Sequence, residues 1–268
     1  MGDETPSRMT RLGRRVGRTA RRAATSPFAD RGDRPLIVHC GHHKAGTVWF
    51  RRTLLDISQA YGLRFRAGMA KPVAPDADVV VYANTREYDR ADLGGRTFRG
   101  SHLIRDPRDL VVSGYEYHLI TDEDWAKVPR DAYAGLSYQD HLRSLDEHAG
   151  LMAEIDWFLP STGAEMLEWD YTQPEFLELR YEEVLTDEHA AFDRLFRWYG
   201  FDDRAVALGH DVVERRSRRN GGARASHPIR AADAGEWRSR LTPAHVEHFK
   251  AASGDLLIRL GYEAGDRW

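Results

Sequence analysis

The feature that most constrains this chain is a short apolar run that leads through a glycine-bearing turn into a helical pattern: "PLIVHCGHHKAGTVWFRRTLL", residues 35–55. The run 36–38 is typical of a central parallel strand that is covered on both faces. Apolar side chains then recur at nearly helical spacing from Thr47 to about Tyr61, which predicts a helix. A strand that enters a helix through such a turn is the repeating unit of parallel α/β domains.

The same alternation of strand and helix patterns continues along the chain. Strands are predicted within residues 76–85, within "FRGSHLIRDPRD" with an end near Arg105, and in "FLELRYEEVL". Helices are predicted over residues 107–118, 137–158, 187–201 and 242–260, the last with Thr242 as N-cap and Pro243 as first helical residue. We therefore predict a single α/β domain over residues 35–268, with a central, mainly parallel sheet flanked by helices.

The turn "GHHKAGT", Gly41 to Thr47, predicts an anion site. N–H groups in the first helical turn have no partner within the helix, and the helix dipole adds partial positive charge. Lys44 adds a cation, although it lies inside the loop, whereas the nucleotide loop G-x-x-x-x-G-K-[ST] has its lysine after the second glycine. An ordinary strand-to-helix turn is the alternative interpretation.

Two features distinguish the segment from an ATP or GTP site, which usually has an acidic residue at the end of a neighbouring strand to hold Mg²⁺. The predicted strand "VVVYANT" ends without an acid, and Asp106 lies beside Arg105, where the site is expected to be cationic. We therefore expect an anion held by lysine and backbone, with no metal ligands.

A second cationic motif lies in "HLIRDPRDLVVSGYEYH", residues 102–118. Arg105 is expected at a strand end, and Ser113 follows in the next helix. Arginine can hold a phosphate through two hydrogen bonds, and serine can donate a third. Local pairing of Arg105 with Asp106 or Asp109 is the alternative.

Together the two motifs resemble those of sulfotransferases that use 3′-phosphoadenosine 5′-phosphosulfate (PAPS). "HKAGTVWF" resembles the family's phosphosulfate loop, P-K-S-G-T-T-W, and "LIRDPRDLVVSGYEYH" resembles its 3′-phosphate motif, R-[ND]-P-[KR]-D-x-x-V-S-x-Y. Weaker similarity includes "LELRYEEVLTD" and "RAADAGEWRSRLT", so that the resemblance extends over about residues 35–262. In the last segment Arg230 matches the family's closing motif, but Ala231 and Ala232 replace its lysine and glycine.

The resemblance implies a P-loop NTPase-like sulfotransferase fold and PAPS as cofactor. Lys44 would stabilise the leaving phosphate oxygen, with loop contacts from Gly46, Thr47 and Val48. The implied cofactor-binding residues are Lys44, Ala45, Gly46, Thr47, Val48, Trp49, Arg105, Ser113, Tyr181 and Arg230. Of these, Trp49 and Tyr181 would lie near the adenine, although Trp49 has core packing as its alternative role.

The acceptor's proton needs a base, and many cytosolic family members have a histidine after the second strand. The comparable stretch here, "VVVYANTREYDR", has none. Glu87 is favoured over His118 as the base, while His43 is expected to shape the loop and His102 to be buried. The acceptor is expected to be a small molecule, a lipid or a glycan, with residues 119–135 covering it. Trp125, Tyr133 and Tyr117 would line its pocket or only anchor that segment.

The amino-acid composition limits the possible binding partners and the cellular location. Of the 268 residues, 1–34 hold nine arginines against four acids within a net charge of −3, so the chain is not a globally basic nucleic-acid binder. Residues 1–34 are predicted to be a flexible basic tail, with weak contact to an anionic surface as the alternative. A single cysteine, Cys40, excludes an internal disulfide framework and favours the cytoplasm. No apolar run is long enough to cross a membrane.

Two other functions compete with the sulfotransferase. A P-loop kinase of a small molecule or nucleotide would also use a phosphate loop, and it would bind ATP with Mg²⁺. A non-catalytic nucleotide-binding protein, recruited by its basic tail, is the second alternative. The presence of Lys44, Arg105 and Ser113 together argues against it.

Overall fold

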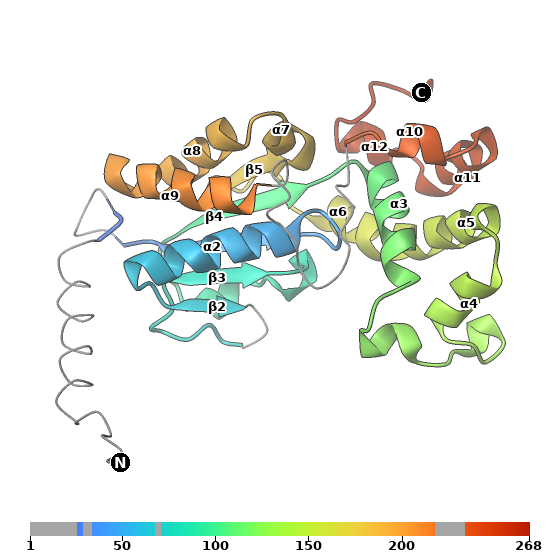
Figure 1. Ribbon diagram of the computed structural model, residues 1–268, viewed down its shortest axis with the longest axis horizontal. Helices are drawn as coiled ribbons and strands as arrows, with labels where there is room; N and C mark the ends of the chain where they lie inside the picture. The colour runs from blue at the N-terminus through green and yellow to red at the C-terminus, as the bar shows by residue number, and fades with distance from the viewer. Residues whose placement is uncertain (1–25, 29–33, 68–70, 218–233) are drawn as a thin grey trace, which may run out of the picture.

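The core of the protein is a five-stranded parallel sheet in the order β2-β3-β1-β4-β5 (Figure 1). This computed structural model describes residues 26–28, 34–67, 71–217 and 234–268. The strands are β1 (Leu36–Gly41), β2 (Phe65–Ala67), β3 (Val79–Tyr82), β4 (Phe98–Ile104) and β5 (Phe176–Arg180). The central strand β1 carries the first motif and its neighbour β4 leads into the second, so the sheet brings the two motifs to one edge.

The segments around Val73, Leu93 and Trp169 cover one face of the sheet. α-Helices cover the other face and extend beyond the carboxyl edge of the sheet. They are α2 (Thr47–Tyr61), α3 (Pro107–His118), α4 (Tyr138–Ser144), α5 (Glu147–Phe158), α6 (Ala164–Glu168), α7 (Tyr181–Thr186), α8 (Glu188–Trp198), α9 (Asp203–Arg216), α10 (Trp237–Arg240), α11 (Pro243–Ser253) and α12 (Leu256–Arg259). Short 3₁₀ turns η1 (Thr85–Glu87), η2 (Arg90–Leu93), η3 (Asp124–Lys127) and η4 (Asp131–Tyr133) and a π-helical turn η5 (Leu159–Gly163) connect them. Within the described residues, no helix is both long and apolar enough to cross a membrane.

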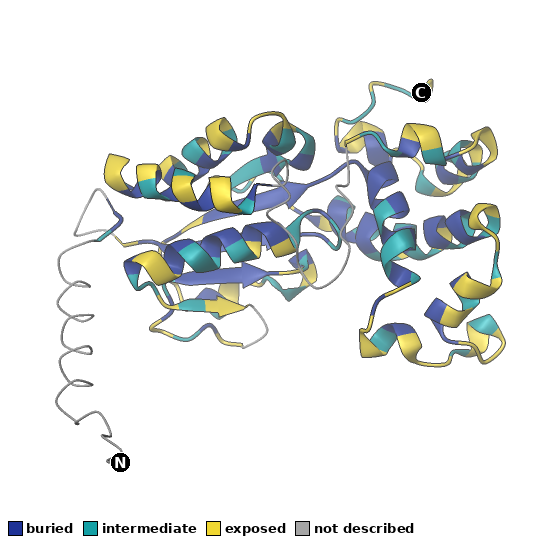
Figure 2. Cartoon of the chain, in the orientation of Figure 1, coloured by how far each residue is buried: buried dark blue, intermediate teal, exposed yellow. Residues whose placement is uncertain are grey.

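Strand side chains alternate between two apolar layers, as expected for a sheet covered on both faces. Ile37 and Val79 pack with α2, α8 and α9, whereas Val38 and Val80 pack with Trp169 and Phe176 on the other face. Figure 2 shows that the strands β1, β3 and β4 are buried along most of their length. A third cluster joins α3, α4 and α5 to α10, α11 and α12 beyond the carboxyl ends of the strands (Figure 1).

The predicted fold class is confirmed, and the predicted helices beginning at Thr47 and Pro107 have the expected bounds. Three predictions of elements were partly wrong. The helix predicted over 137–158 is two helices, because Asp146 caps the second by accepting the N–H of Ala149. The strand predicted in "FLELRYEEVL" ends at Arg180 and continues as α7.

The last predicted helix is also divided, because Gly254, with φ of 56°, follows the end of α11 and α12 begins two residues later. Thr242 and Pro243 are the N-cap and first residue of α11, as predicted. Strand β2 and helix α9 were not predicted from the sequence. The predicted tail, 1–34, falls almost entirely outside the described residues, so its character and the predicted domain boundary stay predictions.

Candidate active site

The loop after β1 has the backbone of an anion-binding turn. Gly46, with φ of 98°, immediately precedes α2, and the first turn of α2 contains no acidic residue. A side chain at Gly46 would be strained at this φ, and its Cβ would lie 3.1 Å from the ring of Tyr181. The N–H groups of the first helical turn therefore remain available to an anion, with no carboxylate competing for them.

Lys44, also in the left-handed region with φ of 66°, extends its side chain toward α3. Its ammonium nitrogen lies 3.9 Å from the centroid of the Tyr117 ring. A cation over an aromatic face is attracted by the ring quadrupole, and the ring holds it without neutralising its charge. The contact joins the loop to the second motif.

Arg105 lies directly after β4 and contacts both the loop and α7. It is 2% exposed, its Nη1 donates to the carbonyl of Lys44 at 3.4 Å, and its guanidinium stacks on Tyr181 at 4.7 Å. Within the described residues, its Nε and Nη2 make no hydrogen bond, and Nη2 is 4.0 Å from Asp109. The buried guanidinium thus has two N–H directions that suit an anion.

The acidic neighbours of Arg105 are engaged elsewhere. Asp106 pairs with Arg108, with oxygen–nitrogen distances of 2.8 and 2.9 Å. Asp109 accepts the backbone N–H groups of Gly235 and Trp237 at 2.7 and 2.9 Å, and burial raises the pKa of its carboxyl. Local pairing with Asp106, an alternative explanation of Arg105, does not occur, and Asp109 approaches Arg105 only at the limit of an ion pair.

The other predicted cofactor-binding residues differ in how deeply they are buried. Ser113 is half-buried in α3, Thr47 begins α2, Ala45 is buried and Val48 is exposed. Trp49 is 4% exposed and packs edge-on against Tyr181 and Phe192 in the core, as its alternative role requires. Its role near the adenine stays a prediction. Arg230 lies outside the described residues.

The two candidate bases have different environments. Glu87, in η1 after β3, is half-buried and accepts the N–H of Ala83 at 3.3 Å. His118, the last residue of α3, is 1% exposed, and its Nδ1 lies 2.8 Å from a carboxylate oxygen of Glu154. His43 stacks on His118 with parallel rings whose centroids are 5.4 Å apart. Burial, with His118 and Lys44 nearby, lowers the pKa of His43 to about 3, so it is neutral.

A buried pair of histidines also joins the loop to β4. His102 on β4 is buried, as predicted, and its Nε2 lies 3.0 Å from the Nε2 of His42. Its Nδ1 is 2.6 Å from Glu178, whose pKa is raised by burial to about 7. Sequence reasoning missed this pair and missed Glu154. Apolar spacing indicates which residues are buried but not which polar groups meet.

The aromatic residues of segment 119–135 serve mainly as anchors in this structure. Trp125 stacks on Trp157 with ring centroids 5.5 Å apart, and Tyr133 stacks on His141 at 4.7 Å. The ammonium group of Lys44 lies over the ring of Tyr117. Exposed apolar side chains lie along or next to the segment at Ile120, Val128 and Leu136, among exposed charged residues.

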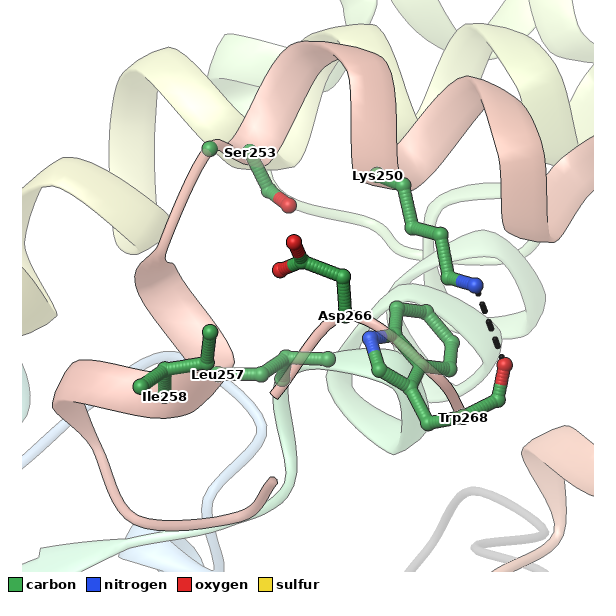
Figure 3. Close-up of a pocket in the computed structure, with 7 residues that line it drawn as sticks. Lys250, Ser253, Leu257, Ile258, Asp266 and Trp268 are labelled. Atoms are coloured by element: carbon green, nitrogen blue, oxygen red, sulfur yellow. Dashed lines mark hydrogen bonds between the residues drawn. The ribbon is translucent and has the colours of Figure 1, made fainter. Parts of the chain in front are cut away.

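A separate pocket of about 330 Å³ lies at the end of the chain, between α11, α12 and Trp268 (Figure 3). In Figure 3 Lys250 reaches across it and donates to the main-chain oxygen of Trp268 at 3.1 Å. None of the residues predicted for the site lines this pocket. The described residues also contain no group of three or more His, Cys, Asp or Glu that could hold a metal ion.

The fold and the site define an α/β protein with a P-loop-like core, in which a loop lysine and a buried arginine meet at the carboxyl edge of a parallel sheet. Comparison with known families identifies it further. The family model described as "Sulfotransferase domain" matches residues 102–261, which is more than half of the chain. The chain therefore belongs to the sulfotransferase domain family.

The fold is supported by a solved structure. Mouse sulfotransferase SULT7A1, solved in complex with PAP, superimposes with a TM-score of 0.60 at 15% identity, and 84% of each chain is covered. A retinol dehydratase solved with androsterone and inactive cofactor PAP gives a TM-score of 0.49 at 16% identity, covering 82% of this chain and 80% of that one. A search of curated protein sequences finds no match.

The prediction of a PAPS-dependent sulfotransferase is thereby confirmed at the level of the family, and the kinase and non-catalytic alternatives are not retained. The matched region contains Arg105, Ser113, His118 and Tyr181. The loop at Gly41–Thr47 precedes it, and its assignment depends on the geometry described above.

Proposed function

We propose that the chain transfers the sulfuryl group of PAPS to a hydroxyl or amine of a small-molecule, lipid or glycan acceptor, with the loop 41–47 holding the 5′-phosphosulfate. The observation that carries this proposal is the contact between Arg105 and the carbonyl of Lys44, because it joins the two cationic motifs in one site. The unbonded Nε and Nη2 of Arg105 are buried donors that fit a second, 3′-phosphate.

The proposed role of each residue follows from the resemblance of its motif to the family. Arg105 and Ser113 bind the 3′-phosphate, and Arg230 would add to them. Tyr181 and Trp49 flank the adenine. Backbone N–H groups of Gly46, Thr47 and Val48 hold the 5′ group at the start of α2. PAPS, when bound, supplies an activated sulfuryl group whose transfer leaves negative charge on a phosphate oxygen.

Lys44 stabilises the negative charge that develops on this phosphate oxygen. A cation fixed where charge develops stabilises the transition state more than the ground state, so it raises turnover rather than affinity. The Tyr117 ring, 3.9 Å from the ammonium, holds Lys44 without cancelling its charge. In this proposal the lysine of the loop and the backbone donors at the start of α2 act on the same group.

The test is Lys44→Ala. We expect turnover to fall by about 10²-fold or more, as for loss of one transition-state donor, while affinity for adenosine 3′,5′-bisphosphate (PAP) changes far less. Steady-state conversion of PAPS to PAP and a calorimetric titration with PAP measure the two effects. Arg51→Ala, an exposed cation farther along α2, is the matched control and should leave both unchanged. Retained turnover in Lys44→Ala would contradict the assignment.

Two further predictions from the sequence, the cellular location and the role of residues 1–34, remain proposals. A cytoplasmic location is supported by the single, buried Cys40, and contact with an anionic surface is supported by the nine arginines among residues 1–34. Unchanged activity and location after removal of residues 1–30 would dispose of the second proposal.

A further inference from the structure

His118 and Glu154 form a buried pair beside the loop. His118 ends α3 and Glu154 lies on α5, the helix that packs against α3 (Figure 1). Their side chains are each 2% exposed, and the Nδ1 of His118 lies 2.8 Å from Oε2 of Glu154. Tyr138 on α4 donates its hydroxyl to the same oxygen at 2.6 Å. Three helices therefore converge on one carboxylate.

The hydrogen bond between His118 and Glu154 determines which ring nitrogen of neutral His118 carries the proton. An ionised carboxylate only accepts hydrogen bonds, so in the neutral ring Nδ1 carries the proton and Nε2 keeps its lone pair. Within the described part of the chain, Nε2 is buried and has no hydrogen-bond partner. A buried acceptor without a partner is costly, and it persists most readily where a ligand completes it. A carboxylate that orients a histidine in this way also stabilises the imidazolium that forms when Nε2 takes a proton.

The pair lies next to the loop that is proposed to hold the 5′-phosphosulfate. The His118 ring stacks on His43, the residue before Lys44, and Tyr117, the residue before His118, carries the Lys44 ammonium. Lys44, the candidate for charge stabilisation, and His118, the candidate for proton removal, thus each contact the sequence neighbour of the other. Gly114 makes room for the pair, since a Cβ there would collide with Oε1 of Glu154. In Glu87, by contrast, one carboxylate oxygen already accepts the N–H of Ala83.

We propose that His118 is the base of the sulfuryl transfer and that Glu154, held by Tyr138, is its positioning residue. The inference rests on the proposed function, and it reverses the preference for Glu87 drawn from the sequence. In the step, Nε2 of His118 takes the acceptor's proton while the acceptor oxygen bonds to sulfur. The bond from sulfur to the bridging phosphate oxygen breaks, and its electron pair leaves with PAP. Glu154 stays ionised and balances the imidazolium.

The first test needs no acceptor. Protein labelled with ¹⁵N-histidine is studied by long-range ¹H–¹⁵N NMR, with and without PAP, and His118→Gln identifies the His118 signals. We expect the neutral ring of His118 to carry its proton on Nδ1 in the wild-type protein. Glu154→Gln should increase the share of the Nε2–H form. A wild-type ring with its proton on Nε2 would overturn the proposal.

The second test is kinetic. PAP formation from PAPS is measured with 4-nitrophenol, butanol, butylamine and glucosamine, and variants are compared on the acceptor that the wild type uses fastest. A positioned base contributes about 10²–10⁴-fold, so His118→Gln should lower kcat by about 10²-fold or more with the KM for PAPS unchanged. Glu154→Gln should lower kcat in the same way. Normal turnover in either variant would overturn the proposal.

Controls separate this role from folding and from the proposed function itself. Asp156→Asn removes a carboxylate from the same helix, where it pairs with the exposed His248 at 2.7 Å, and should leave kcat and the His118 tautomer unchanged. Tyr138→Phe, which removes a single oxygen, replaces Glu154→Gln if that variant unfolds, and should lower kcat at unchanged PAP affinity. If the wild-type protein binds no PAP, the proposed function fails. If it binds PAP and His118 has the other tautomer, only this inference fails.

Discussion

Arg105 and Arg108 are close in sequence, yet their guanidinium groups have opposite surroundings. Arg108 is enclosed by the carboxylates of Asp106 and Glu263 and by the rings of Trp237 and Trp268. It fixes the start of α3 against the end of the chain. Arg105 has no hydrogen-bonded carboxylate within the described residues and stacks on Tyr181 instead. Arg108 is therefore a structural residue, whereas Arg105 has donors that fit the phosphate proposed above.

The role of Arg105 can be tested by comparing two nucleotides. PAP and adenosine 5′-monophosphate differ by the 3′-phosphate, so a residue that binds this phosphate affects only PAP. A hydrogen bond to a charged group is worth about 1.5–3 kcal/mol. We therefore expect Arg105→Lys, which cannot reproduce the planar fork, to weaken PAP binding by about 10-fold or more and to leave binding of the monophosphate nearly unchanged.

Calorimetric titration of both nucleotides measures this difference. Arg99→Lys is the control, because Arg99 is exposed and stacks on Trp198, and it should alter neither affinity. Equal weakening of both nucleotides in Arg105→Lys would assign Arg105 a structural role instead.

Candidate site residues could be selected from the sequence to the extent that their spacing along the chain defines them. Lys44, Arg105 and Ser113 lie in local motifs, so a sequence comparison was sufficient to select them. Glu154 lies 36 residues from His118 and becomes its partner only when α5 packs against α3. Nothing in the local pattern around Glu154 signals that contact, since a glutamate on a helix is usually exposed.

At the scale of elements, chemistry at the helix ends determined which predictions succeeded. Thr47 follows a positive-φ glycine, and Pro107 follows an aspartate that accepts the N–H of Arg108. The sequence was therefore sufficient to predict where both helices begin. The break between α4 and α5 was hidden, because apolar spacing continues through it. The three-residue strand β2 has no strong pattern of its own and forms by pairing with β3.

The packing of α9 on α8 provides a test of the core. Gly209 on α9 faces Phe196, which is fully buried, and a Cβ at this position would collide with its ring. Alanine gains about 0.5–1 kcal/mol over glycine within a helix, whereas overpacking costs about 1–3 kcal/mol. We expect Gly209→Ala to lower the free energy of unfolding by about 0.5–2 kcal/mol.

Urea unfolding followed by circular dichroism measures this change. Gly265→Ala, at a position where a Cβ meets nothing within 4 Å, is the control and should stay within about 0.5 kcal/mol. A gain in stability for Gly209→Ala would show that Phe196 can move and that this part of the core is loosely packed.

At the scale of the whole molecule, the parallel sheet explains why distant motifs form one site. Strands β1 and β4 are neighbours, so the residues that follow them, the loop and Arg105, meet at the same edge. The alternation of strands and helices was sufficient to predict the parallel sheet. It was not sufficient to predict the strand order, which depends on packing between elements far apart in sequence.

The most direct test of the account is a calorimetric titration of the full chain with PAP in the presence of EDTA, followed by ATP with Mg²⁺. The account predicts saturable binding of PAP at one site per chain, unchanged by removal of divalent cations. It also predicts that Mg²⁺ and ATP together bind more weakly than PAP. Absence of PAP binding, together with saturable binding of ATP that requires Mg²⁺, would contradict it.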